Sequence, residues 1–275
     1  MWLGYDTEMR TSVSVSDGAR IAVRGYGGTG RTILLLHGLM GRASTWWRTS
    51  RWLADHGRVV AIDARAHGDS VAPTPGPWPT ERFVTDVVEV LEELALGPAV
   101  VIGHSMGGLH GWELAAARPD LVDGLVVEDM APDHRGRTAA PWVSWFEAMP
   151  ETFDSIAAVR SAFGWPRPSV GDYIAECVRE ASDGYRLLTP HAVAAAIAGE
   201  WGERDFWGSV RRVKCPALLL EAEESPIASE QMATMATLMP RAGHVRVPGT
   251  GHLLHDDAPE RYRELVSEFL TGLAG

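Results

Sequence analysis

The chain has 275 residues, 45% of them hydrophobic and 22% charged, which suits one large α/β domain or two small ones. Its formal net charge of −11 argues against nucleic acid and against an anionic membrane surface as partners. No apolar run approaches the ~18 residues that a membrane helix needs, and the start of the chain lacks the pattern of a signal peptide. We therefore expect a cytoplasmic protein. Its two cysteines, Cys177 and Cys215, are too few for a disulfide framework and are expected to be buried and reduced.

The first predicted elements are strands. Residues 12–15 and 21–24 alternate apolar and polar side chains around Ser16-Asp-Gly18, which predicts an antiparallel hairpin with one solvated face. Continuous apolar runs at 32–36 and 59–62 predict strands that are buried on both faces, as in a parallel sheet.

The rest of the chain mostly alternates strands with helices. Apolar side chains at helical spacing predict a helix over 83–94, and an earlier helix is predicted over 43–54. The remaining predicted elements are strands at 100–102, 125–127, 217–220 and 245–247 and helices at 107–118, 229–239 and 259–272.

One long segment interrupts this alternation. Residues 133–207 predict several short helices with proline and glycine breaks, and they hold too many aromatic side chains for a disordered tether. The alternation elsewhere predicts an α/β fold, with a mostly parallel eight-stranded sheet flanked by helices. We expect a core formed by 1–132 and 208–275, with 133–207 inserted after the sixth strand as a helical lid over the strand ends, where ligands bind.

The segment 99–108 carries a candidate nucleophile. Ser105 lies between a predicted strand and a predicted helix, with Gly103 and Gly107 two residues away on either side. A turn tight enough to lift a serine hydroxyl clear of a sheet leaves no room for side chains at those flanking positions. An ordinary glycine-rich turn would look the same in these five residues alone, so the interpretation depends on the rest of the chain.

A serine hydroxyl needs a base, usually histidine, that is itself oriented by an acid. His252 follows the last predicted strand, in a glycine-rich loop that can approach the serine. His104 neighbours Ser105, so its side chain points away, and His110 lies on the helix. His255 could form a metal site with His252, but no third ligand follows at a suitable spacing, so we expect no metal and no other cofactor.

Two carboxylates compete for the role of the acid. Asp129 ends the strand after the serine helix, and Glu224 ends the next strand, so either could lie near the histidine loop. Asp129 could instead cap a helix, and Glu224 could belong to a solvated acidic cluster with Glu221 and Glu223. Glu128 should face the opposite side of its strand from Asp129.

Two backbone N–H groups are candidates for the oxyanion hole. The N–H of Met106 comes with the turn at Ser105. The second donor is expected at Leu39, in the loop His37-Gly-Leu-Met-Gly41 that follows an early strand.

Four motifs in this order resemble the α/β-hydrolase superfamily over essentially the whole chain, most closely the small esterases of the bacterial YbfF and human ABHD-eleven type. They are His37-Gly-Leu-Met-Gly41, Asp63-x-Arg-x-His-Gly-x-Ser70, Gly103-His-Ser-Met-Gly-Gly108 and Gly249-Thr-Gly-His252. In that group the acid is the aspartate of Asp-x-Ala/Ser-Pro, so the resemblance implies Asp129 and leaves Glu224 as the alternative. It implies structural roles for Arg65 and His67. A serine nucleophile argues against epoxide hydrolase or dehalogenase chemistry.

We therefore predict a serine hydrolase, monomeric or homodimeric, that cleaves a carboxylic ester or thioester of a largely apolar small molecule through an acyl-enzyme on Ser105. A C–C bond hydrolase or lactonase with the same triad is one alternative, and a slow-turnover ligand-binding or receptor protein is another. Most lid aromatics are expected to pack between lid and core. The candidates for substrate contact, from the early loops and the lid, are His37, Trp46, Trp142, Trp145 and Phe146.

Overall fold

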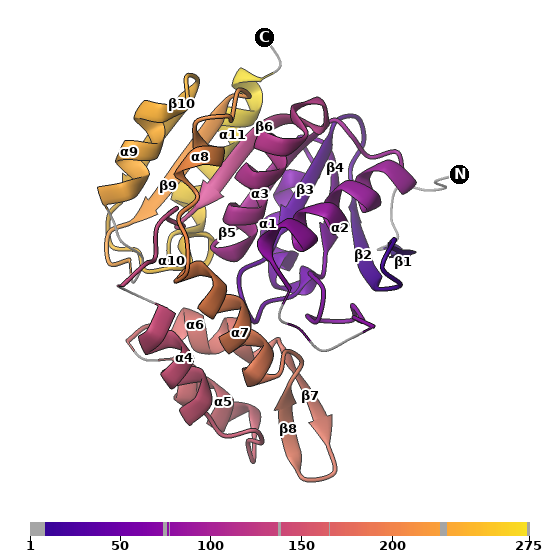
Figure 1. Ribbon diagram of the computed structural model, residues 1–275, viewed down its shortest axis with the longest axis vertical. Helices are drawn as coiled ribbons and strands as arrows, with labels where there is room; N and C mark the ends of the chain where they lie inside the picture. Colours follow the sequence, from indigo (N-terminus) through magenta and orange to yellow (C-terminus); the bar gives the residue numbers. More distant parts are fainter. Residues whose placement is uncertain are drawn as a thin grey trace.

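An eight-stranded sheet runs through the centre of the molecule (Figure 1). The computed structural model describes residues 9–73, 76, 78–136, 139–164, 166–225 and 230–273. The strand order is β1-β2-β4-β3-β5-β6-β9-β10, and neighbours pair in parallel except that β2 is antiparallel to both β1 and β4. The predicted mostly parallel sheet is therefore confirmed. Its strands are β1 (Met9–Ser14), β2 (Arg20–Gly27), β3 (Thr32–Leu36), β4 (Arg58–Ile62), β5 (Ala99–His104), β6 (Val122–Glu128), β9 (Ala217–Ala222) and β10 (Ala242–Val247).

The central strands are buried on both faces. Every residue of β3 and β5 is buried, because helices cover the sheet from both sides. Alternate side chains enter opposite apolar layers: Leu34 and Leu36 face one layer, and Ile33 and Leu35 face the other. The continuous apolar runs in the sequence thus correspond to strands with two buried faces.

Helices α2, α3, α8 and α9 contribute to one apolar layer, and α1, α10 and α11 contribute to the other. Within the described ranges, no helix is both long and apolar enough to cross a membrane. Both cysteines are free; Cys177 is buried, whereas Cys215 is only half-buried and so differs from the prediction. The helices flanking the sheet are η1 (Ala43–Trp46), α1 (Trp47–Leu53), α2 (Thr80–Glu93), α3 (Met106–Ala117), η2 (Pro119–Leu121), α8 (Trp207–Val210), α9 (Glu230–Leu238), α10 (Leu254–Asp257) and α11 (Pro259–Gly272).

The order of the strands creates a switch point beside β3. The chain places β4 on one side of β3 and then β5 on the other side. Connections leaving the carboxyl ends of β3 and β5 therefore diverge, which opens a crevice of the kind that binds ligands in such sheets. The loop after β3 and Ser105 after β5 both start at this point.

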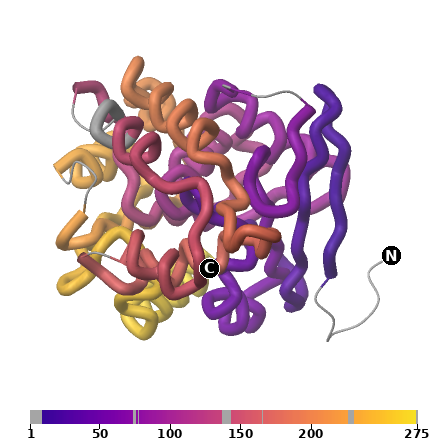
Figure 2. The backbone as a smooth tube through the Cα atoms, turned by 90° about the horizontal axis from the view of Figure 1, so that it is seen from below, coloured from indigo at the N-terminus to yellow at the C-terminus, as the bar shows by residue number. Residues whose placement is uncertain are grey.

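Most of the chain between β6 and β9 forms a separate layer at one end of the sheet (Figures 1 and 2). It contains α4 (Ala139–Ala148), α5 (Ile156–Phe163), α6 (Pro168–Ala175) and α7 (His191–Trp201), as expected for a helical segment. It also contains an antiparallel hairpin of β7 (Val178–Ala181) and β8 (Gly184–Leu187), which the sequence did not predict because each strand has only four residues. We refer to this segment, 133–207, as the lid.

The two ends of the lid lie together. The Phe206 N–H donates to the Pro132 carbonyl at 2.8 Å, and Asp133 forms an isolated bridge with Asp205. This closure supports the proposed division of the chain at 132 and 208.

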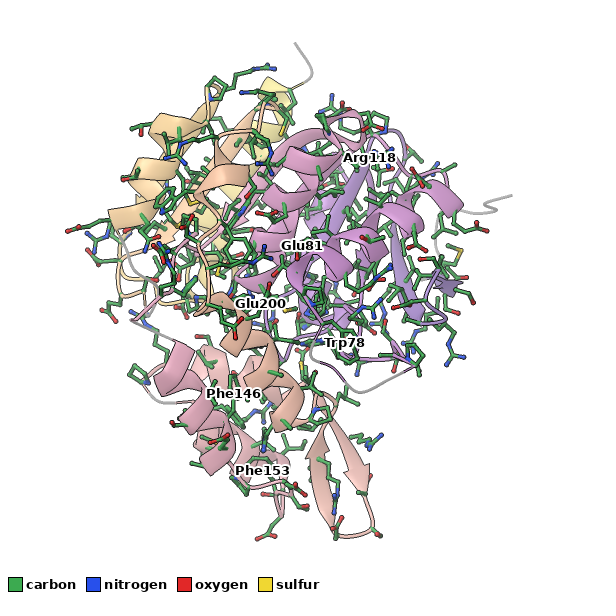
Figure 3. The ribbon with its side chains drawn as sticks, viewed as in Figure 1. Trp78, Glu81, Arg118, Phe146, Phe153 and Glu200 are labelled. Atoms are coloured by element: carbon green, nitrogen blue, oxygen red, sulfur yellow. The ribbon has the colours of Figure 1, made fainter. Side chains whose placement is uncertain are left out.

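Side chains connect the lid to the core at several points. At one junction Glu200 of α7 accepts a hydrogen bond from the Thr80 hydroxyl at 2.5 Å, and Arg204 pairs with Glu81 at 2.6 Å. Figure 3 shows Glu81 and Glu200 at this junction, with Phe146 and Phe153 in the lid. Trp47 of α1 donates from Nε1 to Glu176 beyond α6 at 2.9 Å.

Candidate active site

Ser105 occupies a strained turn between β5 and α3. Its φ of 51° and ψ of −119° lie in a region that non-glycine residues rarely adopt. A Cβ on Gly103 would collide with the Gly107 carbonyl, and a Cβ on Gly107 would collide with the Leu36 carbonyl. The turn therefore requires both glycines. The N–H of Ser105 donates to the Glu128 carbonyl at 2.8 Å, which ties the turn to β6.

His252 and Asp129 are hydrogen-bonded to each other. The His252 Nδ1 lies 2.7 Å from Asp129 Oδ2, and the Asp129 side chain is only 1% exposed. Asp129 also accepts from the Ala222 N–H at 3.0 Å and from the Ser225 hydroxyl at 2.8 Å. These donors fix the carboxylate, and a proton on Nδ1 leaves Nε2 of His252 free to accept another proton.

The other candidate acid, Glu224, has a different partner. Its side chain is 62% exposed, and Oε2 accepts from Arg167 Nη2 at 2.7 Å. Of the two carboxylates that the sequence left open, the structure brings Asp129 to His252 and places Glu224 against the lid.

The loop after β3 lies directly against the serine. A Cβ built on Gly38 would come within 3.3 Å of the Ser105 Cβ. The loop is a tight turn, in which the Gly41 N–H donates to the Gly38 carbonyl at 2.9 Å and Met40 has a φ of 64°. Met106 begins α3, where backbone N–H groups have no partner within the helix. The loop and the helix start therefore converge beside Ser105.

His37 supports this loop from inside. It is 2% exposed, Nδ1 donates to the Gly38 carbonyl at 2.7 Å, and Nε2 accepts from the Ala64 N–H at 2.9 Å. Burial lowers the pKa of His37 to about 4, so the ring is neutral near pH 7. Because both ring nitrogens bind backbone, the prediction that His37 contacts substrate is corrected to a structural role.

Trp46 also differs from its prediction. Its side chain is 1% exposed and stacks on His255, with ring centroids 4.6 Å apart. It belongs to the apolar layer beneath the sheet and not to the rim of the site, because the 3₁₀ turn directs it inward.

The predicted lid contacts divide into three cases. Phe146 is 5% exposed and packs in the apolar layer shared by lid and core. Trp145 is 42% exposed and lies against Phe146 and Phe163, with centroid distances of 5.1 and 5.5 Å. The side chain of Trp142 lies outside the described part of the chain.

Arg65 and His67 lie in the loop after β4. Arg65 is fully buried and binds both oxygens of Asp86, at 2.7 and 2.6 Å, and also Asp17 at 2.9 Å. His67 binds the Arg65 carbonyl at 2.9 Å, and burial lowers its pKa to about 3. These contacts agree with the structural roles implied by the resemblance.

Two lid residues near the site were not predicted from the sequence. Arg167 donates from Nη1 to the Gly249 carbonyl at 3.0 Å, and its side chain packs so closely on Gly251 that a Cβ there would collide. Tyr173 of α6 is buried, and Gly41 leaves the space that its hydroxyl fills. A single arginine or tyrosine in a helical segment has no spacing signal, so no sequence pattern could have identified either.

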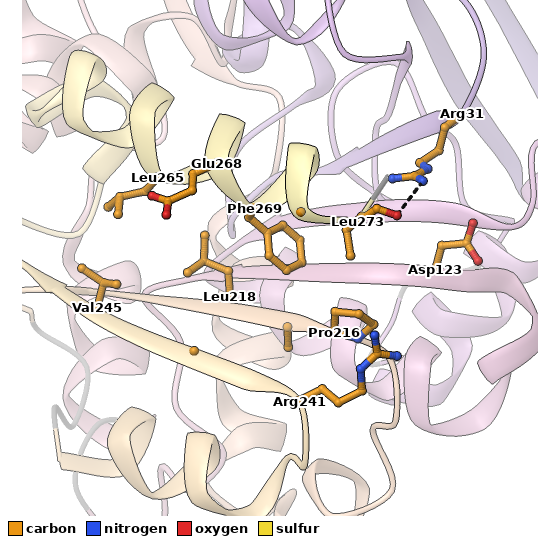
Figure 4. Close-up of a pocket in the computed structure, with 13 residues that line it drawn as sticks. Arg31, Asp123, Pro216, Leu218, Arg241, Val245, Leu265, Glu268, Phe269 and Leu273 are labelled. Atoms are coloured by element: carbon orange, nitrogen blue, oxygen red, sulfur yellow. Dashed lines mark hydrogen bonds between the residues drawn. The ribbon is translucent and has the colours of Figure 1, made fainter. Parts of the chain in front are cut away.

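A separate pocket of about 680 Å³ lies at the other end of the sheet (Figure 4). It is lined by residues at the starts of β9 and β10 and by α11, among them Leu218 and Phe269. Arg31 at this pocket donates to the Leu273 carbonyl at 3.2 Å. Ser105 and His252 follow the carboxyl ends of their strands, so this pocket does not belong to the candidate site.

In the described part of the chain, no group of three or more histidine, cysteine, aspartate or glutamate side chains is arranged to hold a metal ion.

Comparisons with known proteins identify one family. Residues 33–265 match the family model described as "Alpha/beta hydrolase family". The chain is 28% identical to 2-(acetamidomethylene)succinate hydrolase of Mesorhizobium japonicum, over 88% of this chain and 89% of that protein. It is also 28% identical to the sn-1-specific diacylglycerol lipase ABHD11 of Mus musculus, over 87% of this chain and 80% of that protein.

A solved structure matches the fold over nearly the whole chain. The crystal structure of E-2-(acetamidomethylene)succinate hydrolase superposes with a TM-score of 0.87 at 25% identity, covering 96% of this chain and 100% of that one. The resemblance predicted from the four motifs is thereby confirmed.

Proposed function

Because the chain belongs to the alpha/beta hydrolase family, we propose that this enzyme is a serine hydrolase acting on a carboxylic ester or thioester of a largely apolar small molecule. The observation that carries this proposal is the Nδ1–Oδ2 hydrogen bond of 2.7 Å between His252 and Asp129, on loops at the same sheet edge as the strained turn of Ser105.

The reaction follows from these groups. The Ser105 hydroxyl attacks the acyl carbonyl while Nε2 of His252 takes its proton, and Asp129 holds the imidazole and stabilises its charged form. The N–H groups of Leu39 and Met106 bind the oxyanion. His252 then protonates the leaving alcohol or thiol. A water molecule next attacks the acyl carbonyl while His252 takes its proton, and His252 returns that proton to the Ser105 oxygen as the carboxylic acid leaves.

The apolar character of the substrate is supported by the lid. Phe146 and Phe163 are buried, and Trp145 lies against both rings. These rings make the lid side of the interface with the core apolar, and the proposal takes this interface as the place where an acyl chain or ring binds.

A second substrate class is supported by a relative. The protein with a TM-score of 0.87 is named for hydrolysis of 2-(acetamidomethylene)succinate, a small molecule with carboxylates and an amide. The same triad and oxyanion donors would serve an amide, so a substrate panel should include amides beside esters and thioesters. Lactones and C–C substrates test the remaining alternatives.

The proposed nucleophile is tested with a fluorophosphonate probe, which forms a stable adduct with an activated serine. Wild-type protein is expected to be labelled, and Ser105→Ala is expected to remain unlabelled. Failure of the wild type to react would overturn the proposal and favour a binding protein. Labelling that persisted in Ser105→Ala would show that another residue is the nucleophile.

A further inference from the structure

A second carboxylate–histidine pair lies directly behind the first. Glu128 precedes Asp129 at the end of β6, and His255 follows His252 by three residues. The His255 Nδ1 lies 2.7 Å from Glu128 Oε1 and 3.0 Å from Oε2, and the His255 N–H donates to Oε1 at 3.2 Å. The last residue of β6 therefore binds His255 in α10, and the next residue binds His252 in the preceding loop.

This second pair is sealed inside the protein. The Glu128 and His255 side chains are 0% and 2% exposed. Burial disfavours the charged imidazolium, but the Glu128 carboxylate outweighs burial and raises the pKa of His255. Taking two charges out of water is costly, and an apolar pair of similar size often gives equal or greater stability. Stability alone is therefore a weak reason for this pair.

Aromatic rings hold His255 in place. Trp46 stacks on it at 4.6 Å with an interplanar angle of 29°, and Tyr262 meets it edge-on at 5.9 Å. The ring has little freedom to turn, so its bonds to Glu128 have a fixed direction.

His104 connects both histidines to the serine turn. Its ring centroid lies 4.7 Å from that of His252 and 5.5 Å from that of His255. Its Nε2 donates to the His252 carbonyl at 2.9 Å, and it directly precedes Ser105 in the chain. The backbone of His252 is thus held from the side of the nucleophile as well.

The loop that carries His252 needs such support. Strand β10 ends at Val247, so residues 248–253 lie outside the sheet ladder. Separate bonds hold them, such as those that the N–H groups of Gly249 and Gly251 donate to Glu223 and Asp257, at 2.9 and 2.6 Å. Misplacement of a catalytic group by about 1 Å can reduce turnover about 100-fold. The Glu128–His255 pair fixes the far end of this loop to the last residue of β6, next to Asp129.

We propose that Glu128 and His255 are positioning residues, which hold the histidine loop in register with β6 so that His252 stays bonded to Asp129. This inference rests on the proposed serine-hydrolase function. It assigns a role to a buried pair that takes no part in the proton transfers.

The test is a double variant, Glu128→Met/His255→Leu, which replaces the ion pair with apolar side chains. The variant is expected to fold, with a Tm close to that of wild type, yet its rate of labelling by the fluorophosphonate and its kcat should fall about 100-fold with little change in KM. A matched control is Glu221→Met/His244→Leu, because His244 Nε2 lies 2.7 Å from Glu221 Oε2 on β9 and β10. This control should keep the wild-type rate.

The outcomes separate the two proposals. An unlabelled wild type would overturn the proposed function and this inference with it. A labelled wild type together with an equally reactive, folded double variant would overturn this inference alone.

If the double variant does not fold, two single variants of Glu128 that differ in side-chain length test the positioning role instead. Glu128→Gln keeps the length and one acceptor, so labelling should stay within about threefold of wild type. Glu128→Asp keeps the charge but withdraws the carboxylate by one methylene, so labelling should fall at least about fivefold. A rate for Glu128→Asp equal to that of Glu128→Gln would overturn the positioning role.

Discussion

The sheet core and the lid contribute to the candidate site in different ways. Ser105, Asp129 and His252 follow strands β5, β6 and β10, whose backbones are tied together by hydrogen-bonded ladders. The lid instead reaches the site through side chains such as Arg167 and Tyr173.

This difference separates the residues proposed for the chemistry from the segment proposed to cover them. Groups that must meet within a few tenths of an ångström are fixed to a buried sheet, whose displacement would break many bonds at once. No strand ladder joins the described part of the lid to the sheet; apolar packing and separate polar contacts hold it, so we expect a change in its shape to cost less free energy. Substitutions in the core and in the lid should therefore have effects of different size and kind.

The largest effect is expected at Asp129, the proposed acid of the triad in the core. Asp129→Asn removes the charge behind His252 and favours the wrong tautomer, so kcat/KM should fall about 10⁴-fold. Glu224→Gln, which alters an exposed partner of the lid, should change it less than about threefold. Ester turnover measured for both variants checks this, and the opposite ranking would identify Glu224 as the acid.

Apolar packing should show the next largest difference. Leu35→Ala in β3 removes a side chain that is 0% exposed, and the free energy of unfolding should fall by about 3 kcal/mol. Leu187→Ala in β8 removes the same atoms from a short hairpin that can close over the gap, so the loss should be about 1 kcal/mol. Urea unfolding of both variants provides the comparison, and equal losses would argue that lid and core are packed alike.

Lowering the pH should reduce the free energy of unfolding more through buried histidines of the core than through those of the lid. Burial lowers the pKa of His110 to about 3, whereas an unfolded histidine titrates near 6.5. The stabilisation by the neutral ring is complete above pH 6.5 and is lost as the pH falls towards 3, by about 2 kcal/mol at pH 5.

The measurement is urea unfolding at pH 7 and pH 5. His110→Leu should reduce the difference in unfolding free energy between the two pH values by about 2 kcal/mol. His191→Leu in the half-buried start of α7 should reduce it less. An unchanged pH dependence in His110→Leu would contradict the expectation.

The smallest effect is expected where the lid meets the histidine loop. Arg167 joins Gly249, Asp257 and Glu224, at 3.0, 3.4 and 2.7 Å. Its side chain is 24% exposed, so solvent screens these contacts, and Arg167→Ala should cost about 1 kcal/mol, or about fivefold in kcat/KM.

Arg160→Ala is the matched control for this lid contact. Arg160 pairs with Asp172 inside the lid, where both side chains are more than half exposed, so kcat/KM should not change. Equal effects of the two arginine substitutions would show that the contact to the histidine loop has no special role.

The amino-acid sequence by itself determined the fold and the position of the tight turn at Ser105, the proposed nucleophile. Parallel strands buried on both faces produce continuous apolar runs, such as 32–36, that local patterns reveal directly. The turn at Ser105 was equally visible, because its backbone tolerates only glycine at 103 and 107. Both signals arise from interactions over a few residues.

Only the tertiary structure decided which side chains meet. Asp129 and Glu224 end neighbouring strands, and the course of the histidine loop selects Asp129 as the partner of His252. Burial likewise assigned His37 and Trp46 to structural roles.

The lid contact through Arg167 and the pair of Glu128 with His255 join residues more than 80 positions apart. Such contacts depend on how whole helices and strands pack together, and this packing produces no periodic pattern in the sequence.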